Sequence, residues 1–288
     1  MCALLVASQL PAQDPRLDDL RPGQILSLAF RTIPDDFTTM ATAPFNHPQE
    51  SALIAGGLLV LVAADVPLTK AWQQHVEPQV NYKIDGLWKS FAGISFGADT
   101  WLVASLPAWY LGSLTFDSSR GQTAAVLGVK AAAYTYLIDH VVLKTVFARE
   151  RPLNDLASGA SDPGHTDNPW SWGHFHQPYF GERPYEPTAF PSSHFAIYFA
   201  VARVFHEVYG NPWVPYGLAA IGLGSQIRGH MHWVSDMTAG TLLGLGIGHT
   251  VVQNFLGAAP PKVGKVAYSI QPWTDLQGQA GLALTLAW

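Results

Sequence analysis

The sequence predicts an all-α protein: a helical bundle of about six core helices with a site at one end, plus a short C-terminal β-hairpin. The first observation is a series of apolar segments, each long enough for three or more helical turns and most of them ended by glycine, proline or a charged residue. The second is that only the tail, VAYSIQPWTDLQGQAGLALTLAW, changes to alternation of apolar and polar residues. The apolar segments cover about 51 to 65, 94 to 115, 121 to 147, 193 to 209, 213 to 227 and 233 to 256.

The composition narrows the class further. Only 13% of the 288 residues are charged, compared with about 25% in an average soluble protein, and 48% are hydrophobic. Such a chain is either strongly buried or in contact with a membrane. The net charge of −5 and the lack of a basic cluster give no support for nucleic-acid binding. Because Cys2 is the only cysteine, the chain can form neither an internal disulfide nor a thiolate metal site.

Most of the apolar segments are too short or too charged for membrane spans, which need about 20 mostly apolar residues. The first, SALIAGGLLVLVAAD, reaches Asp65 after about fourteen residues, and the third contains Lys130, Asp139 and His140, which a lipid-facing helix would avoid. Only residues 237 to 256 approach the full length of a span. A compact bundle that rests on a membrane therefore fits the sequence at least as well as an integral membrane protein.

The chain divides into three parts. Residues 1–13, MCALLVASQLPAQ, resemble the end of a secretory signal without its positively charged start. Residues 14–260 form the helical-bundle domain, which begins with a polar, proline-bearing stretch where IPDDFTTM predicts one or two helical turns. Residues 261–288 form the hairpin, with LQGQ as its turn, and we expect the hairpin to pack on the bundle.

A long connection, residues 152 to 190, separates the third and fourth apolar segments. It is rich in aromatic residues, which argues against disorder, and we interpret it as a lid or a pocket wall. Its histidines, His165, His174 and His176, have no spacing typical of metal ligands, so we expect them to lie on the surface or along a pocket.

The stretch SQIRGHMHWVSD contains the first candidate for chemistry. His232 and Asp236 are four residues apart, so on a helix they share one face, and the carboxylate can accept the proton of one ring nitrogen. The other nitrogen is then free to attack or to coordinate. His230 has Val234 at the corresponding position, which favours His232 as the working histidine. A histidine that is hydrogen-bonded for packing alone is an equally good interpretation of this stretch.

Two further clusters lie on either side of the long connection. In KTVFARERP, Lys144 and Arg151 are seven residues apart, about two helical turns, so both cations can face one side before the following proline ends the helix. In AFPSSHF, Ser192 and Ser193 precede His194 at the start of a helix, where free backbone N–H groups and hydroxyls form an anion site. Together with the histidines, these residues describe a pocket for a phosphoryl group.

In order, the clusters read K-x6-R-P, P-S-x-H and H-x3-D, and over residues 90 to 256 the chain resembles the superfamily of type 2 phosphatidic acid phosphatases and vanadium haloperoxidases, in its bacterial phosphatase branch. This resemblance implies catalytic roles for three residues. His232 would be the nucleophile that forms a phosphohistidine, oriented by Asp236. His194 would protonate the leaving oxygen and later help to activate the water that breaks the intermediate.

The resemblance also implies a phosphate site without metal. Lys144 and Arg151 would hold the nonbridging oxygens and neutralise charge in the transition state, while Ser192 and the amide of Ser193 would complete the cradle. No cofactor is expected, and vanadate, which occupies the same kind of pocket as phosphate, would act as an inhibitor.

Two positions depart from the pattern of the family. Ser193 stands where the family usually has glycine, but serine keeps the backbone N–H that matters there. Gln226 stands where the family has an arginine six residues before the nucleophile, and the nearest arginine, Arg228, is two places later. Either Arg228 reaches the same oxygens from a bent approach, or Gln226 donates a neutral hydrogen bond there, at a loss of about 1.5 to 3 kcal/mol in phosphate binding.

The resemblance therefore predicts a metal-independent, acid-type phosphatase that hydrolyses phosphate monoesters or lipid (di)phosphates. We expect it in the bacterial cell envelope on the periplasmic side, either soluble or associated with the inner membrane, with a membrane surface as a partner. Two alternatives stay open: a vanadate-dependent haloperoxidase, with vanadate as its cofactor, and a non-catalytic protein that binds an anion or a lipid headgroup.

Overall fold

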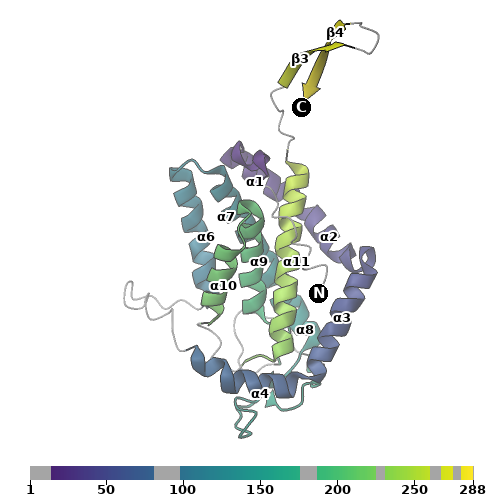
Figure 1. Cartoon of the computed structure of the whole chain (residues 1–288). Coiled ribbons are helices and arrows are strands. Elements are labelled where there is room, and N and C mark those ends of the chain that lie inside the picture. The colour runs from purple at the N-terminus through teal and green to yellow at the C-terminus, as the bar shows by residue number, and fades with distance from the viewer. Residues whose placement is uncertain are drawn as a thin grey trace. The chain divides into compact units, whose positions relative to one another are not determined.

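The structure is a computed structural model that describes residues 14–80, 98–175, 187–224, 231–259, 267–274 and 280–287 (Figure 1). It confirms the predicted all-α class. The helices that correspond to the six expected segments are α3 (Pro48–Ala63), α6 (Ala98–Thr115), α7 (Ser119–Thr135), α9 (Ser193–Tyr209), α10 (Trp213–Gly224) and α11 (Val234–Ala258).

The N-terminal part contains more helix than the sequence indicated. A short 3-10 helix, η1 (Pro15–Asp18), is followed by α1 (Pro22–Arg31) and α2 (Ile33–Asn46), where only one or two turns were expected. Prolines occupy the first turns of α1, α2 and α3, where their missing N–H costs no hydrogen bond. Ile25 and Ala29 of α1 join the main core cluster, so burial, rather than a long apolar run, stabilises this region.

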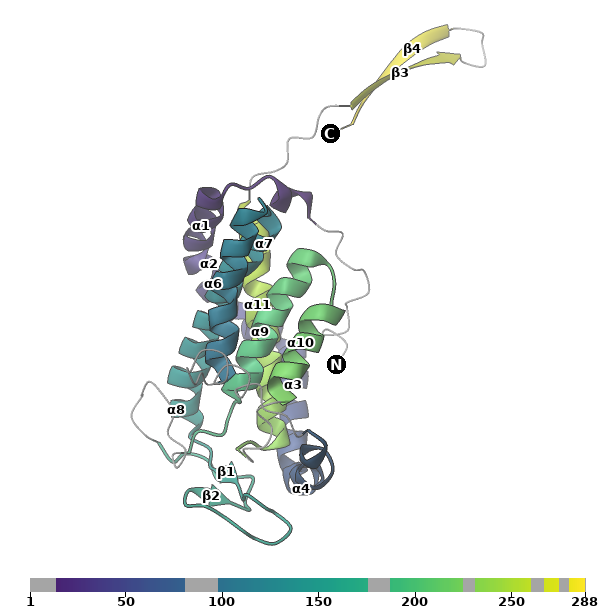
Figure 2. The same ribbon diagram turned by 90° about the vertical axis from the view of Figure 1, so that its left-hand side faces the viewer.

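Helices α9 and α11 form the centre of the bundle and run side by side with α7 (Figure 2). Glycines at every fourth position of α11 allow this close approach. A Cβ atom on Gly240, Gly244 or Gly248 would lie 2.4, 2.1 or 2.5 Å from the carbonyl oxygen of a residue in the first three turns of α9 or just before it. Because α9 begins beside His194 and α11 begins beside His232, this packing also sets the spacing of the two histidines.

Helix α7 continues through a π-helical segment, η3 (Tyr136–Leu143), into the short α8 (Lys144–Phe147). Over Ser119–Phe147 this is the single helix among the described residues that is long and apolar enough to cross a membrane. The pair formed by α3 and the following Asp65–Gln79 passes the same test only together, with a bend of 69° between them. These features are weak evidence for membrane contact, since buried core helices share them.

The long connection begins and ends beside the bundle. Strand β1 (Arg151–Pro152) pairs in parallel with β2 (His165–Thr166), with Arg151 opposite His165. Helix α4 (Asp65–His75) and the 3-10 helix η2 (Glu77–Gln79) lie just before residues 81–97, which are outside the described ranges. Gln73 of α4 donates to the carbonyl of Leu153 and accepts from the amide of Leu156, so α4 holds the start of the connection.

The C-terminal segment forms a unit of its own, which begins at Ala259. In it, β3 (Ala267–Thr274) pairs antiparallel with β4 (Ala280–Ala287). The residues expected to form the turn, LQGQ, lie outside the described part of the chain. The packing of this hairpin on the bundle stays a prediction.

Candidate active site

The clusters around His194 (AFPSSHF) and His232 (SQIRGHMHWVSD) meet at a small cavity of 40 Å³ at the N-terminal ends of α9 and α11. His194 and Ser192 come from the first turn of α9 and the residue before it, and His232 comes from the segment just before α11. The remaining lining residues are Trp72, Glu77, Phe195, Leu223, Met231 and Met237. The cavity therefore brings two histidines and a hydroxyl together in surroundings that are otherwise largely apolar.

The two predicted cations converge on one residue, although not in the expected way. The helix ends at Phe147 rather than at the proline, because Ala148 adopts a left-handed conformation (φ 42°), and Arg151 therefore lies on strand β1. Lys144 Nζ donates to the carbonyl of Thr188 at 2.5 Å, and Arg151 Nη2 donates to the hydroxyl of the same threonine at 2.8 Å. Both cations are buried, at 4% and 9% exposure, and neither is among the residues that line the 40 Å³ cavity.

His232 is held by a backbone carbonyl. Its Nδ1 lies 2.8 Å from the carbonyl oxygen of Ala189, and because a carbonyl only accepts, Nδ1 carries the proton and Nε2 keeps a lone pair. The Oδ2 atom of Asp236 is 3.9 Å from the same nitrogen, beyond hydrogen-bonding distance. The structure thus differs from the expectation that Asp236 orients the ring, because the end of the long connection supplies a closer acceptor.

The surroundings of His232 favour its neutral form. Burial lowers the pKa of His232 well below its ordinary value, and the positive charges of Lys144, Arg151 and His194 lower it further. A neutral ring with a free Nε2 is the form that can attack phosphorus.

The carboxylate of Asp236 accepts hydrogen bonds at the start of α11. One carboxylate oxygen accepts from the amide of Trp233 at 2.9 Å, the half of a capping box that satisfies a free N–H at the helix N-terminus. The other oxygen accepts from Arg149 Nη1 at 2.5 Å. Burial raises the pKa of Asp236 to about 6, although Arg149 and the Trp233 amide favour the charged form.

Arg149 and Asp65 belong to this site, and the sequence did not single them out. Arg149 is fully buried and forms ion pairs with Asp65 of α4 and with Asp236. The sequence could have pointed to Arg149, because it is the first arginine of ARERP, two residues before Arg151. Asp65 was interpreted only as the charge that ends an apolar segment, and its distance of 84 residues from Arg149 hides the pairing.

The two serines before His194 have different surroundings. The hydroxyl of Ser192 is fully buried, lines the cavity and has no hydrogen-bond partner among the described residues. The hydroxyl of Ser193 donates to Asp139 of η3, so only its backbone amide, in the first turn of α9, is left as a donor. The hydroxyl of Ser192 is therefore the one available to a ligand.

Other expected residues lie elsewhere or outside the described ranges. Gln226 and Arg228 fall in residues 225–230, which the structure does not describe, and so does His176 within 176–186. His165 contacts the carbonyl of Pro152 at 2.6 Å, and His174 is exposed beside Ser171. The described ranges contain no group of three or more histidine, cysteine or acidic residues arranged to hold a metal.

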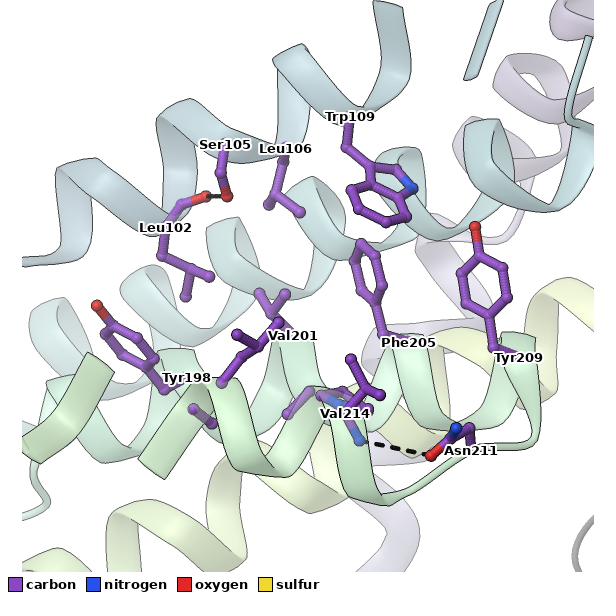
Figure 3. Close-up of a pocket in the computed structure, with 14 residues that line it drawn as sticks. Leu102, Ser105, Leu106, Trp109, Tyr198, Val201, Phe205, Tyr209, Asn211 and Val214 are labelled. Carbon is purple, nitrogen blue, oxygen red and sulfur yellow. Dashed lines mark hydrogen bonds between the residues drawn. The ribbon is translucent and has the colours of Figure 1, made fainter. Parts of the chain in front are cut away.

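A larger, apolar cavity of 440 Å³ lies between α6, α9 and α10 (Figure 3). Trp109 and Phe205, which both line it, contact each other edge to face, with ring centroids 5.5 Å apart. Its lining is almost entirely apolar, and the residues that line it include Leu102, Leu106, Tyr198, Val201, Val214 and Leu218.

Fold and site define an all-α protein with two histidines at a small cavity and two buried cations close by. Residues 123–258 match the model of the family described as the PAP2 superfamily, and this part of the chain carries every described site residue from the three clusters. The match is consistent with the resemblance of the sequence to the type 2 phosphatidic acid phosphatase superfamily. Members of the superfamily are in general phosphatases, which supports a phosphoric ester hydrolase. No curated protein and no solved structure matches the chain significantly.

Proposed function

We propose that this chain is a metal-independent phosphatase that hydrolyses phosphate monoesters or lipid (di)phosphates through a phosphohistidine at His232. The observation that carries the proposal is the hydrogen bond from His232 Nδ1 to the carbonyl of Ala189. This bond leaves a neutral Nε2 on a ring that lines a cavity with His194 and Ser192.

The reaction has two displacements. In the first, the lone pair of His232 Nε2 forms a bond to phosphorus, the bond from phosphorus to the ester oxygen breaks, and that oxygen takes a proton from His194. In the second, His194 removes a proton from a water molecule, whose oxygen bonds to phosphorus as the bond from phosphorus to Nε2 breaks. Inorganic phosphate leaves, and both histidines return to their starting forms.

The two buried cations, Lys144 and Arg151, would stabilise the negative charge of the phosphoryl group. Lys144 and Arg151 are fixed through Thr188, so they need little rearrangement when negative charge develops on the nonbridging oxygens. The hydroxyl of Ser192 and the amide of Ser193 add hydrogen-bond donors at the start of α9, where the helix dipole also favours an anion.

An amphiphilic substrate at a membrane surface is part of the proposal. Helix α3 supports it, because residues 52 to 61 carry no charge and the side chains of Leu53 and Val60 are 70% and 68% exposed. A helix that is apolar on all sides and yet exposed is stable against lipid rather than in water. We expect the wild-type protein to sediment with phospholipid vesicles and the double variant Leu53→Asp, Val60→Asp to stay in solution. Thr38→Asp, an exposed change on α2, is the control, and equal sedimentation of all three would contradict membrane contact through α3.

The proposed reaction is tested by phosphate release from an aryl phosphate, phosphatidic acid and an isoprenyl diphosphate, in the presence of a chelator. Turnover that continues with chelator and disappears in His232→Ala is the expected result. Turnover that needs an added metal would contradict the mechanism, and so would turnover that survives in His232→Ala. Binding of phosphate without turnover of any substrate would favour an anion-binding protein.

A further inference from the structure

Arg149 lies between the two cations of the first cluster along the chain, but its guanidinium group forms ion pairs with two carboxylates of the protein. Like Lys144 and Arg151, it is buried and is not among the residues that line the cavity. Its Nη2 donates to Asp65 at 2.8 Å, and its Nη1 donates to Asp236 at 2.5 Å. Two carboxylates thus offer more negative charge than its single positive charge needs, so Arg149 is occupied within the protein and does not serve as another phosphate ligand.

The other donors and the flat faces of the guanidinium group are also used. Nη1 donates to the hydroxyl of Ser235 at 2.8 Å, and Nε and Nη2 donate to the carbonyl of Pro169 at 3.1 and 2.7 Å. The indole rings of Trp172 and Trp233 lie 4.5 and 5.2 Å from the guanidinium carbon. Only arginine combines a planar fork of donors with faces that stack on aromatic rings, so lysine cannot reproduce these contacts.

These contacts close a ring of hydrogen bonds around His232. The backbone carbonyl of Arg149 accepts from the amide of Ala189 at 3.0 Å, and the carbonyl of Ala189 accepts from His232 Nδ1. On the other side, the Arg149 side chain binds Asp236, which accepts from the amide of Trp233, the residue that follows His232. Arg149 therefore holds the acceptor of the His232 ring with its backbone and the adjoining backbone of His232 with its side chain.

Helix α4 completes the support. Asp65 accepts from the amide and hydroxyl of Ser235, and the hydroxyl of Thr69 accepts from the amide of Val234 at 3.2 Å. The first amides of α11 are thus capped by another helix, and Arg149 joins that helix to α11 through Asp65. This junction adds to the bond from the indole N–H of Trp233 to the carbonyl of Glu150 at 3.1 Å, and together they fix the backbone that carries His232 relative to the segment of Arg151.

We propose that Arg149 is the positioning residue of His232: it fixes the direction of the Nε2 lone pair without contacting the substrate. The proposal rests on the proposed function only in taking His232 as the nucleophile. A small misplacement of the attacking nitrogen lowers the rate of the chemical step more than it weakens substrate binding, because binding depends on Lys144, Arg151 and Ser192.

The test compares Arg149→Lys with Arg120→Lys. Arg120 is a matched control, because it pairs with Asp18 and donates to the carbonyls of Val208 and Asp14, away from the ring around His232. For Arg149→Lys we expect kcat to fall about 10- to 100-fold while KM changes less than about threefold. In ¹⁵N NMR spectra the two ring nitrogens of His232 should lose the wide separation of a fixed Nδ1–H tautomer. Arg120→Lys should lose thermal stability but keep kcat and the His232 spectrum.

Unchanged kcat and an unchanged His232 spectrum in folded Arg149→Lys would overturn the proposal, and so would an effect on KM alone. If Arg149→Lys does not fold, Asp65→Asn provides the same comparison, because it removes the charge that anchors the guanidinium group and keeps the shape of the side chain. The NMR measurement separates this proposal from the proposed function. A wild-type protein without phosphatase activity whose His232 signals still change in Arg149→Lys would refute the reaction and leave the positioning role intact.

Discussion

The carbonyl oxygen of Ala189, at the end of the long connection, lies 2.8 Å from Nδ1 of His232 and sets the tautomer of that ring. This relationship joins two of the clusters that the sequence separates by a long segment. The end of the long connection also binds the other site residues, because Thr188 accepts hydrogen bonds from Lys144 and Arg151. The interpretation of this segment as a lid or a pocket wall stays a prediction, because neither Thr188 nor Ala189 lines the cavity.

The first prediction concerns the charge of His232. Because burial and three neighbouring cationic groups lower its pKa, the ring should stay neutral as the pH falls from 8 through 6.5. In that range the unfolded chain takes up a proton that the folded chain does not, so His232 makes stability fall as the pH drops below about 6.5. A ¹⁵N NMR titration, with the signal assigned by its loss in His232→Gln, measures this directly. Protonation of His232 near pH 6.5 would contradict the site as described.

The second prediction separates phosphate ligands from other buried cations. Lys144→Gln and Arg151→Gln should each weaken competitive inhibition by phosphate or vanadate by about 1.5 to 3 kcal/mol, or about 10- to 150-fold. Lys130 is the control, because it is also nearly buried but pairs with Asp36 at 2.5 Å. Lys130→Gln should reduce stability and leave the inhibition constants unchanged. Equal inhibition constants in all three folded variants would show that Lys144 and Arg151 do not bind phosphate.

The third prediction contrasts the two adjacent serines. Ser192→Ala removes a buried hydroxyl without a hydrogen-bond partner in the described structure, so stability should stay within about 0.5 kcal/mol of wild type while phosphate affinity falls about fivefold. Ser193→Ala removes the hydrogen bond to Asp139 and should cost about 1 to 3 kcal/mol of stability with a smaller effect on phosphate affinity. Denaturant unfolding and phosphate inhibition of both variants check the contrast, and the reverse pattern would exchange the two roles.

The fourth prediction concerns the packing of α9 on α11. Gly244→Ala would place a Cβ atom 2.1 Å from the carbonyl oxygen of Ala196, so the two helices must separate, at a cost of about 1 to 3 kcal/mol or more. Activity should fall with stability, because His194 and His232 lie at the ends of these helices. A Cβ atom on Gly246 of the same helix would meet no other atom within 4 Å, and Gly246→Ala should keep activity and gain up to about 1 kcal/mol. Similar melting temperatures for both variants would show that the close approach is not required.

The helices and the clusters could be predicted because each depends on local pattern. The apolar segments correspond to helices, and the spacing of Lys144, Arg151, His194 and His232 indicated a shared pocket. The prediction that Lys144 and Arg151 share one helix was wrong. Arg151 lies on a strand after a left-handed residue at Ala148, and an alanine gives no sequence signal for that conformation.

The supporting residues could not be predicted, because their roles exist only in the folded chain. Asp65 and Asp236 share one arginine although they are 171 residues apart in the sequence. The acceptor for His232 is a backbone carbonyl, which every residue carries and no sequence pattern marks. The expected pairing of His232 with Asp236 was reasonable for two residues four apart on a helix, but α11 begins only at Val234, so His232 lies before it.

The central claim, that His232 carries the phosphoryl group, is tested most directly by trapping the intermediate. His194→Ala is mixed with an aryl phosphate, whose leaving group needs little protonation, and the reaction is stopped in alkali, where phosphohistidine survives. Peptide mass spectrometry should then find one phosphoryl group on His232, released as phosphate on acidification and absent from His232→Ala. A phosphoryl group on another residue, or turnover by the wild-type protein with no phosphorylated His232 at any quench time, would contradict the account.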